Sequence, residues 1–430
     1  MKRRVAFKTV GCRLNQHETE SIATQFRRAG YEIGDFSDAA DVYIINTCTV
    51  TGQSDQKSRQ YLHRAAGRKP DPVVVVTGCM ATRNRETLEA QSDATYVVDN
   101  ARKSSIFALV DGHFRGEVVH PRDMRPDFFD YPVSDRVLRT RSTIKVQDGC
   151  DNACAFCIIP RVRGTAVSRP HQDVIRNVRE VVDRGALEVV ITGVNIGRYH
   201  DGQVNIDGLL ESILELPGDF RVRVSSLEPD GFGERFMDLL SHEKMTPHLH
   251  LCLQSGSERI LRRMRRMYTL TGYLEMIARI RQIVPDINLT TDALVGFPGE
   301  TDDDFEATLA VLKDIRFSHI HTFKYSMREG TRAAGMEEQI PEAVKASRSA
   351  AVRELSLEQR NRYLSGMVGR RQRLLVERVH GGVARGYGQH YVPLELADSD
   401  IGINRFVDVM ITEKSIRGER PVLRAEAIAS

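Results

Sequence analysis

Short apolar runs alternate with helix-like segments along most of this 430-residue chain. Between about residues 141 and 330, six runs have strand character, and helix candidates such as 170–185 and 272–285 lie between them. Strands that alternate with helices form parallel sheets or barrels, so this region is predicted to be a partial (β/α)6 barrel, short of the usual eight units. The six runs are STIKVQD, EVVITGV, RVRVSSL, HLHLCLQ, INLTTDALVG and HIHTFKY.

The regions on either side of this barrel have different patterns. The N-terminal region repeats the alternation with RVAFKTV, DVYIINT and PVVVVTG, which predicts a small parallel sheet in an α/β domain. The stretch 113–138 has no clean periodicity and three prolines, and is interpreted as a linker or strap. The C-terminal region is strand-rich with glycine turns, which fits a small antiparallel β-barrel. The predicted domains are 1–112, 136–366 and 367–430.

The composition is that of a water-soluble protein, with 41% hydrophobic and 28% charged residues. No run of about 18 apolar residues exists, so neither a transmembrane helix nor a membrane partner is expected. Lys8 interrupts the apolar run after the basic start, which argues against an export signal and for a cytoplasmic protein. Seven cysteines, an odd number, then favour metal-binding or catalytic thiols over a disulfide framework.

Three cysteines lie close together in the segment GCDNACAFC, residues 149–157. They are Cys150, Cys154 and Cys157, and they follow the first strand of the predicted barrel. A structural zinc ion or a cubane iron–sulfur cluster normally takes four protein ligands. This segment therefore predicts a metal site that leaves one coordination position open.

A second group of three cysteines ends the three apolar runs of the N-terminal region. Cys12, Cys48 and Cys79 occupy the same place in successive β-α units, so they are expected to converge at one sheet edge. A single buried cysteine is common in proteins, but three cysteines at the same position of successive β-α units favour a metal site. No second close cysteine pair lies near them, so an iron–sulfur cluster with an open iron fits better than zinc.

The CxxxCxxC spacing before a sixfold β-α pattern resembles the radical S-adenosylmethionine (SAM) superfamily. The whole chain is similar to the methylthiotransferases, which add an N-terminal three-cysteine domain and a C-terminal TRAM barrel. The resemblance implies two [4Fe–4S] clusters, one on Cys150, Cys154 and Cys157 that binds SAM, and an auxiliary one on the N-terminal cysteines that carries the transferred sulfur. The motifs are TVGCRLNQHETE, INTCTVT, VTGC, DGCDNACAFCIIPRVRG, LQSGSERILRRMRR and DALVGFPGET.

The segments GCRLNQHE, NTCTVT and KSR resemble the branch that acts on N6-threonylcarbamoyladenosine at position 37 of tRNA, next to the anticodon. That branch forms the 2-methylthio derivative. Phe156, where the family often has tyrosine, and a less basic RGTAVSRP segment are departures. The alternatives are the same chemistry on isopentenyladenosine or on a ribosomal-protein aspartate, and a non-catalytic, metal-stabilised RNA-binding protein. The resemblance also implies the tRNA anticodon loop as partner and an external electron donor, and the chain is expected to be a monomer.

The SAM contacts are expected in the loops after barrel strands two, four and five. Glycine lets the backbone approach a ligand closely, and amide and hydroxyl groups offer polar contacts. Ordinary turn chemistry is the alternative for each position. No catalytic residue is assigned beyond the cluster ligands. The expected cofactor-binding residues are Gly193, Asn195, Gln254, Ser255, Val295 and Phe297.

Several further residues receive weaker interpretations. His248 and His250 are interpreted as packing residues of the barrel interior, Cys252 as an inert buried thiol, and Asp292 as a residue that points to the barrel mouth and orients substrate. The arginine-dense segment 258–268 is either a solvated helix face or part of a polyanion-binding surface. In the C-terminal region, the residues expected to grip RNA are Arg370, Arg371 and Arg373 through phosphates, and Tyr387 and Tyr391 through stacking or, equally, core packing.

Overall fold

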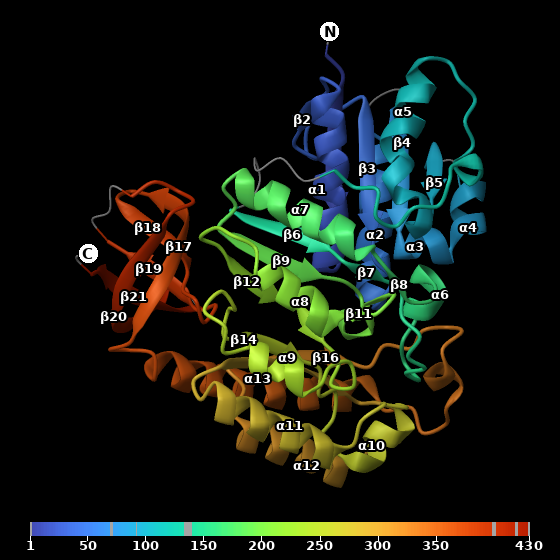
Figure 1. The fold of residues 1–430 in the computed structure, drawn as a ribbon. Helices are drawn as coiled ribbons and strands as arrows, with labels where there is room; N and C mark the ends of the chain where they lie inside the picture. Colours follow the sequence, from blue (N-terminus) through green and yellow to red (C-terminus); the bar gives the residue numbers. More distant parts are fainter. Residues whose placement is uncertain are drawn as a thin grey trace.

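The N-terminal region forms a five-stranded, fully parallel sheet in the order β2-β1-β3-β4-β5 (Figure 1). The computed structural model describes residues 2–68, 72–91, 93–132, 140–397, 401–417 and 420–428. The strands are β1 (Arg4–Thr9), β2 (Glu32–Gly34), β3 (Val42–Thr47), β4 (Val73–Gly78) and β5 (Tyr96–Val98). The helices are α1 (Arg13–Arg28), α2 (Gly52–Ala66), α3 (Cys79–Arg83), α4 (Arg85–Ala90) and α5 (Ile106–Phe114), with short 3-10 turns η1 (Asn100–Ser105) and η2 (Pro121–Asp123).

All residues of β3 and β4 are buried, because both faces of this sheet are covered. One core contains Ile44 and Val75 with residues of α1 and α5, and the other contains Ile45 and Val76 with residues of α2 and α3. Alternate residues of each strand thus supply the two cores. The three predicted strands of this region are confirmed, and the short edge strands β2 and β5 were not predicted.

The central region is the expected open barrel with six strand positions. Its strands form two sheets, β12-β9-β6 and β13-β14-β15-β16, because the third strand position is broken at Ser225. The strands are β6 (Arg141–Lys145), β9 (Glu188–Thr192), β12 (Arg221–Val224), β13 (Ser226–Leu227), β14 (His248–Leu251), β15 (Asn288–Val295) and β16 (His319–Lys324). The connections between these strands contain two short antiparallel pairs. They are β7 (Gln147–Asp148) with β8 (Val167–Ser168), and β10 (His200–Asp201) with β11 (Val204–Asn205).

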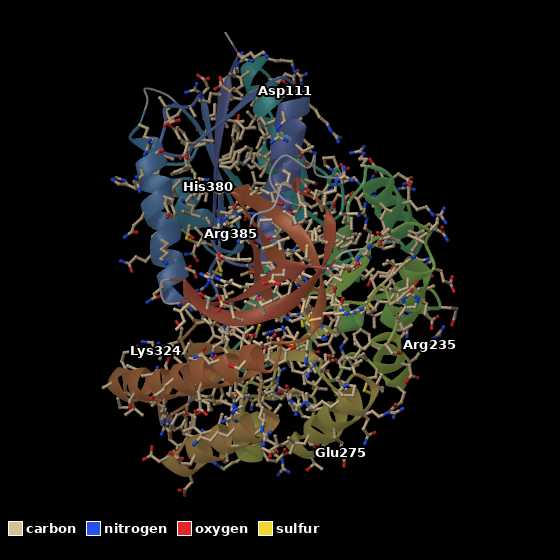
Figure 2. All side chains as sticks on the ribbon, turned by 90° about the vertical axis from the view of Figure 1, so that its left-hand side faces the viewer. Asp111, Arg235, Glu275, Lys324, His380 and Arg385 are labelled. Carbon is tan, nitrogen blue, oxygen red and sulfur yellow. The ribbon has the colours of Figure 1, made fainter. Side chains whose placement is uncertain are left out.

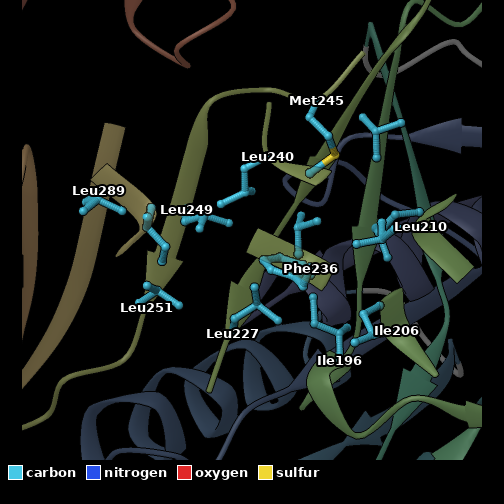
Figure 3. Packing of buried hydrophobic residues seen from close by; sticks show 14 of the residues in the cluster. Ile196, Ile206, Leu210, Leu227, Phe236, Leu240, Met245, Leu249, Leu251 and Leu289 are labelled. Atoms are coloured by element: carbon cyan, nitrogen blue, oxygen red, sulfur yellow. The ribbon is translucent and has the colours of Figure 1, made fainter. Parts of the chain in front are cut away.

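Helices surround this barrel, and their apolar faces fill the space against the strands. Figure 3 shows part of this core, in which Phe236 lies near Leu227 and Leu249. The helices are α6 (Ile159–Arg163), α7 (His171–Asp183), α8 (Ile206–Leu214), α9 (Glu234–Leu239), α10 (Glu258–Arg263), α11 (Leu270–Ile283), α12 (Asp302–Ile315) and α13 (Glu342–Ser365), with 3-10 turns η4 (Ile196–Arg198) and η5 (Arg332–Gly335).

The C-terminal region closes into a five-stranded barrel in the order β17-β18-β19-β21-β20. The strands are β17 (Arg371–His380), β18 (Val383–Tyr387), β19 (Pro393–Leu396), β20 (Phe406–Arg417) and β21 (Arg420–Ala427). The prediction of a purely antiparallel barrel needs one correction, because β19 pairs with β21 in parallel. β20 and β21 form a long antiparallel hairpin. Its second strand, β21, closes the barrel against β19 and runs in the same direction as β19.

The predicted linker 113–138 is partly regular. His113 and Phe114 end α5, and Pro121 begins a 3-10 turn, whereas 133–139 lie outside the described residues. Within the part of the chain that the structure describes, no helix combines the length and apolar character needed to cross a membrane.

Candidate cluster and cofactor site

The three N-terminal cysteines lie at one edge of the parallel sheet. Cys12 is the N-cap of α1, Cys48 follows β3, and Cys79 is the first residue of α3, directly after β4. Gly11 and Gly78 let these turns come together, since both have left-handed φ values of 102° and 98°. A Cβ atom on Gly11 would lie only 2.6 Å from Cβ of Cys48, so the first two cysteine turns are in contact.

The thiols of this group interact with one another. Burial is the largest cause that raises the pKa of Cys48, to about 11, and the neighbouring Cys79 and Cys12 raise it further. The protein packed around Cys12, whose own side chain reaches the surface, and the proximity of Cys79 also raise the pKa of Cys12, against an opposing effect of Arg163. Thiolates so close together need a cation that neutralises them, so the donor set fits a metal or an iron–sulfur cluster.

The second cysteine group lies on the loop between β7 and α6. Gly149, with φ 68°, starts this loop, and a Cβ there would lie 1.9 Å from the carbonyl oxygen of Thr165. Burial raises the pKa of Cys157 to about 12, and Cys154 and Cys150 add to the effect. These three thiols therefore share one site, as the sequence spacing predicts, and their soft sulfur donors fit an iron–sulfur cluster.

Arg266 is a cation at this second group, although its segment 258–268 was expected to be either a solvated helix face or part of a polyanion-binding surface. Its Nη1 donates to Sγ of Cys154 over 3.2 Å, and its guanidinium also pairs with Glu228. The other arginines of 258–268 with described ion pairs contact nearby carboxylates, such as Arg259 with Asp304. Much of this segment therefore serves the barrel and its cysteine loop.

Gly193 and Asn195 lie beside Cys150, in the loop after β9. Nδ2 of Asn195 donates to Sγ of Cys150 over 3.8 Å, while its Oδ1 is buried without a partner among the described residues. Gln147 holds this loop, since its Oε1 accepts from the backbone N–H groups of Val194 and Asn195 over 3.0 and 2.7 Å. A buried acceptor beside Cys150 that lacks a partner among the described residues would fit a cationic donor such as the amino group of SAM.

The other four expected SAM contacts lie at the ends of β14 and β15. Gln254 has a φ of 65°, uncommon for a residue other than glycine, and Ser255 contacts the hydroxyl of Thr308 over 3.2 Å. Phe297 is fully buried and packs edge-on against Phe156. Val295 is also buried, so the SAM roles of these four residues stay predictions.

A buried ionic network, which the sequence reasoning did not predict, joins the two cysteine loops. Glu18 of α1 accepts hydrogen bonds from Lys103, Lys145 and Arg163, and Arg163 also pairs with Asp148, two residues before Cys150. Burial alone would raise the pKa of Glu18, but Arg163, Lys103 and Lys145 hold it well below the usual range. The sequence signal is that Glu18 falls in phase with Leu14 and Ile22 on the apolar face of its helix.

Two further contacts bring the cysteine loops together. Nδ2 of Asn100 donates to Sγ of Cys79 over 3.6 Å and to the carbonyl oxygen of Val162 over 2.8 Å. Cys79 also belongs to an apolar cluster with Ile158 and Val162, which follow Cys157. The two cysteine groups are therefore neighbours across the boundary between the N-terminal sheet and the barrel.

The barrel interior holds a polar group formed by His250, Cys252 and Asp292. Nε2 of His250 lies 3.2 Å from Oδ1 of Asp292, and Sγ of Cys252 donates to the other carboxylate oxygen over 3.9 Å. Burial raises the pKa of Cys252 well above its usual range, in keeping with an inert thiol. His248 packs against Tyr391, whereas His250 makes polar contacts rather than purely apolar ones.

The expected RNA-contacting residues lie where the C-terminal barrel meets the central one. Arg370 pairs with Asp286, and Arg373 pairs with Asp219, while Arg371 is exposed. Tyr387 and Tyr391 stack on each other with ring centroids 4.7 Å apart, so their rings belong to an aromatic cluster within the protein.

This geometry agrees with two family models and a solved structure. The radical SAM superfamily model matches residues 144–312, and the uncharacterized protein family UPF0004 model matches residues 4–99. The radical SAM methyltransferase TsrM from Kitasatospora setae has a similar fold, with a TM-score of 0.59 and 16% identity over 78% of this chain and 77% of that one. The fold and the cysteine loop thus define a radical SAM protein.

Relatives with higher identity share most of the chain. Threonylcarbamoyladenosine tRNA methylthiotransferase MtaB of Bacillus subtilis (strain 168) is 38% identical over 361 residues, 80% of this chain and 78% of that protein. The protein of that name from Chlamydia pneumoniae is 34% identical over 416 residues, 95% and 96% respectively. This chain therefore belongs to the threonylcarbamoyladenosine tRNA methylthiotransferase family, and its cofactors are SAM and [4Fe–4S] clusters.

Proposed function

We propose that this chain converts N6-threonylcarbamoyladenosine at position 37 of tRNA to its 2-methylthio derivative. The observation that carries this proposal is the direct contact between the two three-cysteine loops, through Asn100 and the Glu18–Arg163 pair. Insertion of sulfur needs a sulfur carrier and a source of radicals within reach of one base. Two neighbouring, incompletely ligated clusters meet that need, and a non-catalytic zinc protein has no use for the arrangement.

Each cysteine group has its own role in this proposal. Cys150, Cys154 and Cys157 hold the cluster that binds SAM, and Cys12, Cys48 and Cys79 hold the auxiliary cluster. When bound, these groups supply the sulfur, the methyl group and the radical. Among the remaining residues, Asn195 orients SAM, Gln147 fixes the loop that carries Asn195, and Arg266 places positive charge against Cys154. Phe156 and Phe297 keep water away from the cysteine loop.

The proposal extends to the partners of the reaction. The substrate is the anticodon loop of tRNA, electrons come from an external donor, and the enzyme acts as a cytoplasmic monomer. The cavity at the junction of the two barrels is lined by more arginines than carboxylates, which supports the RNA partner because arginines bind phosphates. Figure 2 shows this side of the molecule, with Arg385 on the C-terminal barrel.

Anaerobic reconstitution and nucleoside analysis test the function. Wild-type protein is expected to hold about eight irons, and alanine replacement of either cysteine group to leave about four. Mass spectrometry of tRNA from a deletion strain should show loss of 2-methylthio-N6-threonylcarbamoyladenosine, restored by the wild-type gene but by neither triple variant. A colourless zinc protein would refute the enzyme, and loss of 2-methylthio-isopentenyladenosine instead would refute the substrate.

A further inference from the structure

A large cavity lies where the N-terminal region, the central barrel and the C-terminal barrel meet. Its volume is about 1590 Å³, and its lining includes Arg13, Thr192, Arg223 and Tyr387. Arg13 directly follows Cys12 of the auxiliary cluster group, and Thr192 directly precedes Gly193 of the SAM loop. The cavity thus reaches the residue next to Cys12 and the residue next to Gly193, which makes it a candidate space for the substrate base.

Three guanidinium groups of the cavity lining, those of Arg13, Arg141 and Arg223, surround Tyr391. Nη2 of Arg13 and Nη1 of Arg141 donate to the hydroxyl oxygen of Tyr391 over 3.0 and 3.4 Å, and Cζ of Arg223 lies 4.3 Å from the centre of its ring. Tyr391 has a φ of 57°, a left-handed conformation that is uncommon for tyrosine. The turn is held in place by the stacked ring of Tyr387, so the three cations keep fixed positions.

The carboxylates nearby do not neutralise these cations. Glu188 is shared by Arg141, Arg221 and Arg223, and Glu377 pairs with Arg141. Arg13 makes no ion pair with any residue that the structure describes. Four arginines against two carboxylates leave a positive potential. In agreement, Arg223, Arg141 and Arg13 outweigh the effect of burial and lower the pKa of Tyr391.

We propose that Arg13, supported by Tyr391 and Arg223, binds the carboxylate of the threonyl group of the substrate nucleoside and thereby selects it over nucleosides with a neutral N6 group. This inference rests on the proposed function. A guanidinium matches a carboxylate through two parallel hydrogen bonds, and Arg13 is the cation of the three that has no such partner. Arg13 directly follows Cys12. A base whose carboxylate is bound by Arg13 therefore lies near the auxiliary cluster, which its C2 atom must face.

An RNA phosphate is the other oxyanion that these groups could bind. The phosphates belong to the backbone, outside the base, and the exposed arginines at the cavity rim, such as Arg378, are placed for them. A test must therefore change the carboxylate and leave every phosphate in place. The probes are three anticodon stem-loop RNAs of one sequence, with N6-threonylcarbamoyladenosine, its threonyl amide or plain adenosine at position 37.

Binding of these RNAs to anaerobically reconstituted protein is measured by fluorescence anisotropy. Wild-type protein is expected to bind the carboxylate RNA about tenfold more tightly than the amide RNA, as one charge-assisted contact predicts. Arg13→Gln should bind the two RNAs equally and Arg13→Lys should keep part of the preference, with iron content at the wild-type value. If Arg13→Gln loses iron, Tyr391→Phe replaces it as the test, because Tyr391 does not adjoin a cluster ligand. Tyr391→Phe should then reduce the preference for the carboxylate RNA. The matched control Arg378→Gln, at the cavity rim, should weaken binding of all three RNAs alike.

Two results with the variants would overturn the inference, and one result with wild-type protein would do so as well. In the first, Arg13→Gln and Tyr391→Phe keep the wild-type preference for the carboxylate RNA over the amide RNA. In the second, they weaken the binding of all three RNAs by the same factor, which identifies a phosphate contact. A wild-type protein that methylthiolates the carboxylate RNA without preferring it over the amide RNA would also refute carboxylate recognition. Failure of the proposed function is separate, because wild-type protein would then leave the threonylcarbamoyl RNA without a 2-methylthio group, whichever of the three RNAs it binds most tightly.

Discussion

Three side chains outside the two cysteine groups donate hydrogen bonds to cysteine sulfurs. Arg266 donates to Cys154, Asn100 to Cys79 and Asn195 to Cys150. Hydrogen bonds and cations around cluster sulfurs tune the cluster and orient its ligands. These three residues therefore matter for the cofactors although none of them is a metal ligand.

Replacing Asn195 by alanine should weaken SAM binding without loss of the clusters. The buried Oδ1 of Asn195 lacks a partner in the described structure, so a bound amino group is expected to satisfy it. We expect the Kd for SAM to rise about tenfold, the effect of one lost hydrogen bond to a charged group, with iron content at about eight per chain. Isothermal titration of the reconstituted protein measures this. Asn177→Ala, on α7, is the control, and an unchanged Kd in Asn195→Ala would contradict the assignment.

Glu188 should make the stability of the protein depend on pH in the acid range. Burial raises its pKa, but Arg141, Arg221 and Arg223 outweigh that effect and lower it to about 2, against about 4.3 in an unfolded chain. The contribution is complete above pH 4.3 and is lost as the pH falls towards 2. It amounts to about 3 kcal/mol. Urea unfolding of wild type and Glu188→Gln should differ by this amount at pH 7 and converge at pH 2. A difference in the free energy of unfolding that does not change with pH would contradict the lowered pKa of Glu188.

The loops at the ends of parallel strands bring the thiols together because glycines let the backbones approach. Gly11 and Gly78 sit against the Cys48 turn, and Gly149 sits against Thr165. The carboxyl ends of the strands in an open parallel sheet share one edge, so cysteines that follow successive strands converge there. The six strand runs, the helices between them and the phase of the cysteines are all readable from periodicity.

Replacing Gly149 by alanine should remove one cluster and leave the other. A Cβ at this position would collide with the carbonyl oxygen of Thr165 at 1.9 Å, so the loop that carries Cys150 must move. We expect iron to fall from about eight to about four per chain, measured with the absorbance of the reconstituted protein. Gly202→Ala is the matched control, since its φ of 62° is also left-handed and nothing lies within 4 Å. Full iron content in Gly149→Ala would show that the loop adapts.

The three regions of the protein meet around two charged assemblies. The Glu18–Arg163 network joins the N-terminal region to the barrel, and the arginines around Tyr391 join both to the C-terminal barrel. Fully buried ion pairs contribute little net stability, but removal of one partner is costly because the other charges stay buried. The network therefore fixes how the two cysteine loops face each other.

Replacing Glu18 by glutamine should destabilise the protein and disturb the register of the two cluster loops. Lys103, Lys145 and Arg163 would keep their charge with Asp148 as the remaining carboxylate of the network. We expect a loss of about 3 to 5 kcal/mol in urea unfolding and lower methylthiolation at full iron content. Glu86→Gln, an exposed change on α4, should stay within about 0.5 kcal/mol of wild type. Equal stability of both variants would rule out the role of the network.

The six cysteines, the sheet and the two barrels follow from local patterns, because strand and helix periodicity and the place of each cysteine are written in consecutive residues. The contacts that couple them do not. Glu18 meets Arg163 across 145 positions of chain, and Arg13 meets Tyr391 across 378. A charged residue on an apolar helix face signals that a partner exists, but only the packing of three regions selects which partner. The tertiary structure alone therefore decides that the two cysteine loops are neighbours and which cations line the cavity where the three regions meet.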